Sequence, residues 1–342
     1  MMKQDIKNLD FAQLQEYLRE HKQPAFHAGQ VFGWIYKKGV RTFSEMSDLS
    51  AALRKKLDED FYIYGTRIYK KLDSIDGTQK FLIELNDANL IESVSIPTER
   101  RVTGCISSQV GCKYACRFCA SGLVGFKRNL SCGEMLEEVL LLNAAKKLTH
   151  IVFMGTGEPL DNYDELLKAI RIINSAEALT IGARRITIST CGVIPGIKRL
   201  AQEDLQVELS VSLHSANDLT RSMLMPANKV FPLKELISVC GEYIKKTKRQ
   251  VTFEYILIKG RNSDLQSAQK LATILKPLRL CKVNLIPANP VKELNLEPPG
   301  KLEMLLFKDR LLKQGLNVTL RKERGRDIDA ACGQLRLRHE KK

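Results

Sequence analysis

Three of the nine cysteines, Cys112, Cys116 and Cys119, lie close together in the stretch GCKYACRFCASG. The chain starts MMKQDIKNLD, without the apolar segment of an export signal, and thiols in a cytosolic protein stay reduced, so a disulfide framework is not expected. Three thiolates in a C-x3-C-x2-C spacing can bind three irons of a 4Fe-4S cluster and leave the fourth iron open to an outside ligand. The alternative is a structural zinc site completed by Cys105, because zinc prefers four tetrahedral ligands.

Composition and charge indicate which class of protein contains these cysteines. The 342 residues are 44% hydrophobic and 27% charged, as in ordinary globular proteins, and have room for one large domain and a smaller one. No apolar run approaches the roughly 18 to 20 residues of a membrane-spanning helix, so we expect a cytoplasmic protein. The excess of 54 Lys and Arg over 39 Asp and Glu favours a polyanionic partner, most often nucleic acid, with a merely basic solvated surface as the alternative.

The first hundred residues change from a helical to a strand pattern. Residues 1–60 carry apolar side chains at helical spacing, such as Phe11 and Leu14, and Ser50 can cap a further helix, which predicts a small helical domain. Residues 61–100 contain three short alternating runs, TRIYKKL, KFLIEL and LIESVSIP, with an Asp-Gly pair between the first two. This pattern is typical of hairpins and predicts a short antiparallel extension.

Residues 101–320 alternate between strand-like and helix-like segments. Such repeated β-α units predict a parallel sheet, and six or more of them fit a partial (β/α)6 barrel of the TIM type. In that fold the chemistry lies at the carboxyl ends of the strands, and the three cysteines follow the first of them. Residues 321–342 form a C-terminal segment with a basic end. The predicted strands are TGCISSQ, HIVFMG, RRITIST, VELSVSLH, QVTFEYILI and CKVNLIPA, followed by LNVTLRK.

The cysteine spacing, with Phe118 just before the last cysteine, resembles the signature of radical S-adenosylmethionine (SAM) enzymes. Longer stretches resemble the RlmN family of RNA methyltransferases, with the Cfr-type enzymes as near relatives. The resemblance covers nearly the whole chain and implies a partial barrel, a 4Fe-4S cluster on Cys112, Cys116 and Cys119, and SAM as cofactor. It also implies 23S ribosomal RNA and transfer RNA as substrates, an electron donor such as flavodoxin or ferredoxin, and a monomer. The stretches are FHAGQVFGWIYKKGV, FSEMSDLSAALRKKL, SSQVGCKYACRFCASG, GFKRNL and RGRDIDAACGQL.

The same resemblance assigns residues that contact SAM at four strand ends. In GTGEPL, glycine lets a backbone carbonyl approach the ligand and a carboxylate can pair with its ammonium group. Taken alone, such a turn is more often the start of a helix, and the other positions alone read as capping or turn residues. The predicted SAM contacts are Gly157, Glu158, Ser189, Ser212, Leu213, His214 and Asn289.

Three further residues receive catalytic roles from the resemblance alone. Cys332, in DAACGQL, matches the cysteine that carries a methyl group from one SAM and loses a hydrogen from it to the radical made from a second. Cys105 matches the thiolate that attacks the sulfur of Cys332, forming a transient disulfide that frees the product. Glu92, in LIESVSIP, matches the base that removes the ring proton. Without the resemblance, both cysteines would read as buried small apolar residues and Glu92 as a strand position.

The resemblance therefore predicts methylation of carbon 2 of adenosine, in ribosomal RNA at the peptidyl transferase centre and in transfer RNA beside the anticodon. The Cfr-type reaction at carbon 8 is the near alternative, because both families use the same cluster and cysteine pair. An alternative of another class is a zinc-stabilised RNA-binding protein without catalysis. We expect the helical residues 1–60 to bind RNA in either case, through basic side chains such as Lys37, Lys38 and Arg41.

Overall fold

The computed structural model describes residues 3–123, 125–289, 296–321 and 324–328. Its centre is a ten-stranded sheet in the order β14-β13-β12-β11-β10-β9-β6-β5-β4-β3. The seven strands from β6 to β14 pair in parallel, and the remaining three continue the same sheet with antiparallel pairing. The parallel strands are β6 (Val102–Ile106), β9 (His150–Phe153), β10 (Ile186–Thr190), β11 (Glu208–Ser212), β12 (Val251–Leu257), β13 (Cys281–Pro287) and β14 (Asn317–Leu320).

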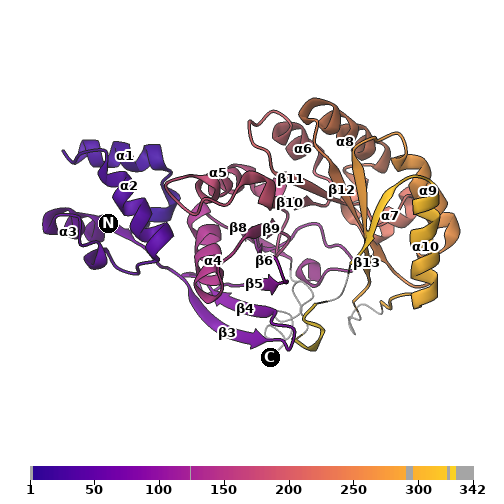
Figure 1. The fold of residues 1–342 in the computed structure, drawn as a ribbon, viewed down its shortest axis with the longest axis horizontal. Coiled ribbons are helices and arrows are strands. Elements are labelled where there is room, and N and C mark those ends of the chain that lie inside the picture. The colour runs from indigo at the N-terminus through magenta and orange to yellow at the C-terminus, as the bar shows by residue number, and fades with distance from the viewer. Residues whose placement is uncertain (1–2, 124, 290–295, 322–323, 329–342) are drawn as a thin grey trace.

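Helices connect these strands and lie on the outer side of the curved sheet (Figure 1). Within the described residues β6 pairs with β5 and β9 while β14 pairs only with β13, so the parallel strands form an open, partial barrel, as the sequence predicts. A short helix, α7 (Asp218–Leu224), follows β11 and was not predicted. The connecting helices are α4 (Cys132–Ala145), α5 (Tyr163–Asn174), α6 (Ile194–Leu200), α8 (Leu233–Thr247), α9 (Leu265–Leu275) and α10 (Lys301–Lys313). Single 3₁₀ turns are η5 (Pro159–Asn162), η6 (Ala183–Arg185) and η7 (Pro226–Lys229).

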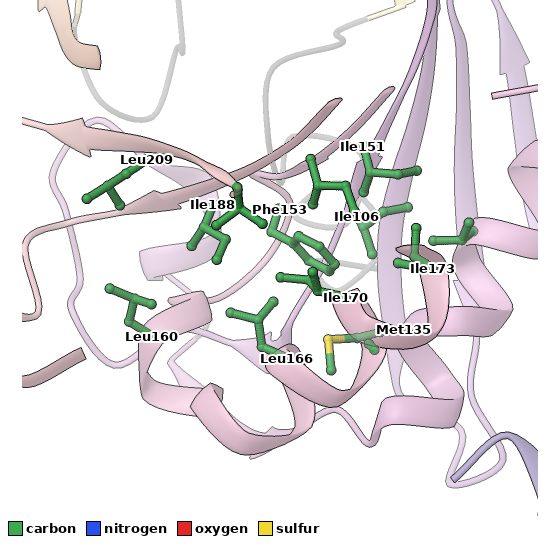
Figure 2. Packing of buried hydrophobic residues seen from close by; sticks show 14 of the residues in the cluster. Ile106, Met135, Ile151, Phe153, Leu160, Leu166, Ile170, Ile173, Ile188 and Leu209 are labelled. Atoms are coloured by element: carbon green, nitrogen blue, oxygen red, sulfur yellow. The ribbon is translucent and has the colours of Figure 1, made fainter. Parts of the chain in front are cut away.

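The outer face of the sheet forms the apolar core against these helices. Phe153 and Ile188, from neighbouring strands, point toward Leu166 and Ile170 of α5 (Figure 2). All four side chains are at most 1% exposed. Alternate residues of the same strands therefore point into the barrel, because successive strand side chains lie on opposite faces.

The antiparallel extension is continuous with the barrel. Gly77 has a φ of +81° in the tight turn between its first two strands, a conformation that few residues other than glycine adopt. Across the junction with the barrel, Val94 of β5 faces Cys105 of β6. The predicted hairpins are therefore one edge of the main sheet. Its strands are β3 (Arg67–Asp73), β4 (Gln79–Glu84) and β5 (Leu90–Pro97).

The N-terminal helices pack beside α4. Ser50 caps α3 as predicted, its hydroxyl accepting a hydrogen bond of 3.2 Å from the Leu53 N–H. Asn8 Oδ1 accepts the N–H of Gly133 at the start of α4, over 2.7 Å. A two-residue strand pair, β1 with β2, was not predicted, because strands this short have no periodicity. The elements are β1 (Gln4–Asp5), η1 (Ile6–Asn8), α1 (Phe11–Glu20), α2 (His27–Phe32), the π-helical η2 (Gly33–Lys38), η3 (Phe43–Glu45), α3 (Ala51–Asp60) and β2 (Phe61–Tyr62).

The end of the described chain, η9 (Arg326–Ile328), is tied to the turn between β3 and β4. The Ser74 hydroxyl donates to Asp327 over 2.6 Å, the Ile75 N–H donates to the same carboxylate over 3.1 Å, and Asp76 accepts the Gly325 N–H over 3.0 Å. Separately, no helix among the described residues is long and apolar enough to cross a membrane.

Candidate active site

A small hairpin frames the three clustered cysteines. Strands β7 (Gln109–Gly111) and β8 (Phe126–Asn129) pair antiparallel and hold residues 112–125 as a loop between them. Gly111 has a φ of +77°, and a Cβ at this position would lie 1.7 Å from the Gly125 carbonyl oxygen. The loop can close only because residue 111 has no side chain. This hairpin was not predicted from the sequence.

The loop is also fixed against the barrel. The Arg117 N–H donates to the Leu224 carbonyl at the end of α7 over 2.9 Å. Phe118 stacks edge-to-face on His214, with ring centroids 4.5 Å apart. The aromatic residue of the cysteine motif thus contacts a predicted SAM residue, so the first and fourth parallel strands contribute to one site.

Two of the three thiols hold their protons more strongly than an exposed cysteine does. Burial raises the pKa of Cys112 to about 12. Burial, followed by the nearby thiols of Cys119 and Cys112, raises the pKa of Cys116 well above its usual value. These mutual effects show that the thiols lie near one another. A bound cation would have to displace their protons, which is how thiolate metal sites form.

The donor set fits an iron–sulfur cluster. Among the described residues, no three His, Cys, Asp or Glu side chains are arranged around one metal-sized position. In a 4Fe-4S cluster each thiolate binds a different iron, so its ligands need not converge on one point. Three buried hydroxyls without a described partner lie beside the loop, those of Ser108, Ser121 and Thr156. Buried polar atoms normally find partners, so these hydroxyls are consistent with a bound polar cofactor.

The GTGEPL turn is held against the cysteine hairpin by close backbone contacts. A Cβ on Gly155 would lie 2.6 Å from Ser107 Oγ, and Gly157, with a φ of +106°, approaches the side chain of Gln109. The Thr156 N–H donates to Ser107 Oγ over 2.9 Å, and the Glu158 N–H donates to Gln109 Oε1 over 2.8 Å. The glycines are required for this packing whether or not a ligand binds.

Glu158 already performs a structural task with its carboxylate. It is 3% exposed, and it caps η5 by accepting the Leu160 N–H over 3.1 Å. Its other oxygen accepts the Cys191 N–H, just after β10, over 2.7 Å. The turn is therefore the start of a helical segment, as its sequence alone predicts. Any contact of Glu158 with SAM has to use its backbone or the remaining oxygen lone pairs.

The predicted contacts on β10 and β11 share the inner face of the barrel. Cys105 faces Val152 of β9, which faces Thr187 of β10, and paired residues lie on the same face of a sheet. Ser189 follows two residues after Thr187, and Ser212 ends β11 in the same alternation. Cys105, Ser189 and Ser212 therefore all point into the barrel.

His214 lies directly after β11 in a left-handed backbone conformation, with a φ of 56°. Burial, and then the charge of Arg221, lower its pKa to about 3, so the ring is neutral. Its Nδ1 accepts the Ile256 N–H over 3.0 Å. Leu213 beside it is fully buried. Asn289 is exposed beyond the end of β13, at the edge of the described residues.

Glu92 and Cys105 come from neighbouring strands and lie on the same face. Val94 faces Cys105 across β5 and β6, and Glu92 lies two residues from Val94 along β5. Glu92 is 4% and Cys105 7% exposed. The Ser107 hydroxyl donates to the Glu92 carbonyl over 2.7 Å. The structure thus brings the predicted base and the predicted resolving cysteine to the same mouth, while Cys332 lies outside the described residues.

Two buried basic residues at this site were not predicted from the sequence. Arg221 of α7 is fully buried and donates to the carbonyls of Cys191, Leu213 and Ser212 over 2.8, 3.1 and 3.2 Å, which joins two of the predicted SAM-binding strand ends. Lys80 of β4 is fully buried with its Nζ 3.5 Å from Glu92 Oε1. Neither residue lies in a spaced motif, so no sequence signal separated them from surface charges.

Comparisons with known proteins support the assignment of the three-cysteine loop and the partial barrel to one class of enzyme. Residues 106–271 match the radical SAM superfamily, and residues 4–63 match the ribosomal RNA large subunit methyltransferase N-terminal domain. A crystal structure of a radical SAM methyltransferase from Sphaerobacter thermophilus superposes with a TM-score of 0.93 at 40% identity, covering 97% of this chain and 98% of that one. The fold and the three-cysteine loop thus define a radical SAM protein.

Curated relatives narrow the class further. A probable dual-specificity RNA methyltransferase RlmN from Clostridium novyi is 43% identical over 335 residues, 97% of each chain. One from Bacillus cytotoxicus is 44% identical over 344 residues, covering 99% of this chain and 95% of that one. The chain belongs to the RlmN family.

Proposed function

We propose that this protein is an RNA methyltransferase that adds a methyl group to carbon 2 of adenosine in 23S ribosomal RNA and in transfer RNA. The observation that carries the proposal is the meeting of three elements at one barrel mouth: the cysteine loop, the inner-face Ser189 and Ser212, and the pair Glu92 and Cys105. The dual-specificity names of the relatives and the basic charge of +15 support RNA as the substrate.

In this proposal Cys112, Cys116 and Cys119 hold a 4Fe-4S cluster, and the strand ends hold SAM. Bound together, cluster and SAM supply a carbon radical able to abstract a hydrogen atom. Gly157 and Glu158 offer backbone atoms to the ligand, Ser189 and Ser212 offer hydroxyls, and Leu213, His214 and Asn289 complete the cradle. The contact of Phe118 with His214 helps to exclude water from this pocket.

Cys332, Cys105 and Glu92 transfer the methyl group and remove the ring proton. Cys332 would carry the methyl group as a thioether. That methyl group would lose one hydrogen atom to the radical derived from SAM and its carbon would add to the adenine ring, and the excess electron of the adduct would be taken up by the cluster. Glu92 removes the proton from the ring carbon. The Cys105 thiolate then attacks the Cys332 sulfur, so that an S–S bond forms, the S–C bond to the RNA breaks, and its electron pair leaves with the methyl carbon, which takes up a proton.

Mass spectrometry of nucleosides tests the proposal directly. Unmodified transfer RNA and 23S ribosomal RNA are incubated with the reduced, anaerobically purified protein, SAM and flavodoxin or ferredoxin, and then digested. We expect 2-methyladenosine from both RNAs. Recovery of 8-methyladenosine would identify the Cfr-type reaction instead.

A metal assay distinguishes the catalytic proposal from a zinc-stabilised RNA-binding protein. Anaerobic protein should be brown and contain about four irons per chain. A colourless protein with one zinc would contradict the proposal. We also expect the enzyme to act as a cytoplasmic monomer, which size-exclusion chromatography with light scattering can check.

A further inference from the structure

Lys80 is buried at the active site in a way that needs an explanation. Its side chain is fully buried, and its Nζ lies 3.5 Å from Oε1 of Glu92, which is 4% exposed. Lysine is almost never fully buried unless it is paired, because removing an ammonium group from water is costly. An apolar residue would fill this strand position at lower cost, so the charge itself has a use.

The register of the strands places this charge on the catalytic face. Lys80 faces Val94 across β4 and β5, and Val94 faces Cys105 across β5 and β6. Leu82, two residues after Lys80, faces Glu92. Lys80 is therefore a diagonal neighbour of Glu92 and lies in one cross-strand row with Cys105.

A second buried carboxylate in the same region provides a comparison. Glu138 of α4 is 1% exposed and receives hydrogen bonds from the Ser93 hydroxyl and from the Ser107 N–H. Burial raises its pKa well above the usual value despite these bonds. Burial therefore makes the charged form of a carboxylate costly in this part of the molecule, which is the cost that a neighbouring cation offsets.

We propose that Lys80 is a positioning residue for proton removal, whose ammonium group holds the Glu92 carboxylate through an ion pair and directs it into the site. The inference rests on the proposed function, in which Glu92 is the base. When the ring C–H bond breaks, the proton goes to Glu92 and the bonding electron pair stays with the RNA adduct, whose one excess electron would be taken up by the iron–sulfur cluster. The proton then passes from Glu92 to water, and the base is restored.

Substitution of Lys80 by methionine tests this role, because methionine has a similar length and no charge. The chain offers a matched control in Lys7, which is also fully buried and pairs with Asp5 over 2.7 Å, next to the N-terminal helices. The variants K80M, K80R and K7M are purified anaerobically with their clusters and assayed with transfer RNA. Release of methylated RNA is followed by mass spectrometry, and the covalent RNA–protein complex by denaturing gel.

We expect K80M to form the covalent complex at a rate close to that of the wild type but to release methylated RNA about 100-fold more slowly. K80R should recover part of the release rate. K7M should show the wild-type release rate, even if it lowers the melting temperature.

The outcomes separate this inference from the proposed function. If E92Q accumulates the complex while K80M releases RNA as fast as K7M, the role of Lys80 is wrong and the proposed function stands. If E92Q releases product at the wild-type rate, the assignment of Glu92 as base fails, and the role of Lys80 fails with it. Equal slowing of complex formation and release in K80M would indicate general damage and would also overturn the inference.

Discussion

The two faces of the barrel sheet differ in chemistry although the same strands form both. On the outer face, Phe153 and Ile188 are fully buried against helices. On the inner face, Ile188 is flanked by the polar Thr187 and Ser189 and Phe153 by Val152 and Met154, and all four are only half-buried. The alternation of one strand thus specifies the core with one set of residues and the site with the other. Substitutions on the two faces should therefore fail in different ways.

The largest effect is expected from the cysteine loop, at the mouth of the inner face. Cys116→Ala removes one of the proposed iron ligands and should abolish both the cluster and RNA methylation. Cys240→Ala is the matched control, since Cys240 is a buried thiol on α8, among the core residues outside the barrel. Iron content and absorption spectra measure the difference. A full complement of iron in C116A would contradict the assignment.

On the outer face, Phe153→Ala should destabilise the fold and spare the chemistry. Phe153 is fully buried in the core, and such a truncation costs about 3–5 kcal/mol in free energy of unfolding. Urea unfolding of the apoprotein measures this loss. Below the melting temperature, we expect iron uptake and methylation per folded molecule to stay within about twofold of the wild type. Loss of iron from folded F153A would show that the two faces are not independent.

The two ends of β11 should also differ in function, because only its carboxyl end lies at the proposed SAM site. Arg221→Met removes the donor to the carbonyls that follow β10 and β11, and should weaken SAM binding about 10- to 100-fold, equivalent to about 1.4–2.7 kcal/mol. Arg249→Met is the control at the opposite end, where Arg249 donates to the Val207 carbonyl over 3.1 Å. Equilibrium binding of SAM to the cluster-loaded proteins is the measurement. Equal weakening by both variants would disprove a specific role for Arg221.

The inner-face histidine should give a pH-dependent stability. Burial, and then Arg221, hold the pKa of His214 near 3, whereas an unfolded histidine titrates near 6.5. Below about pH 6.5 the histidine therefore binds a proton in the unfolded chain but not in the folded chain. Stability should fall as the pH drops below about 6.5, by up to about 1.4 kcal/mol per pH unit. Urea unfolding between pH 5 and 7 should show this slope in the wild type and a shallower one in His214→Gln.

The smallest effect is expected outside the barrel, where Asp327 accepts hydrogen bonds from Ser74 and Ile75. The carboxylate is solvent-exposed, so Asp327→Asn should change global stability by less than about 1 kcal/mol. Limited proteolysis should nevertheless cleave the C-terminal segment faster in this variant. Asp309→Asn, on the outer helix α10, is the control and should leave the cleavage rate unchanged.

Long periodic segments could be predicted from the sequence, and contacts between distant segments could not. The barrel strands and the helices α4, α5, α6, α8, α9 and α10 follow their hydrophobic patterns, and Ser50 caps its helix as expected. Helix α7, the pair β1–β2 and the hairpin β7–β8 were missed, and the strands of the two pairs are too short to show a period. The hairpin further depends on the contact of Gly111 with Gly125, which involves tertiary geometry.

The candidate site shows the same division. Spacing alone singled out Cys112, Cys116 and Cys119, whereas Cys105 and Glu92 required the family resemblance. Arg221 and Lys80 could not be found, because only the fold reveals that these charges are buried. Cys332 lies outside the described residues, so its role stays a prediction.

The junction of β5 and β6 has a consequence for engineering this family. Because Glu92 and Cys105 belong to adjacent strands, their separation is set by a backbone ladder and not by the closing of one domain on another. A chimaera cut near residue 100 would place these residues on segments of different parentage and put their register at risk. Grafts should carry β3 to β6 as one cassette, so that the spacing between the two side chains is inherited intact.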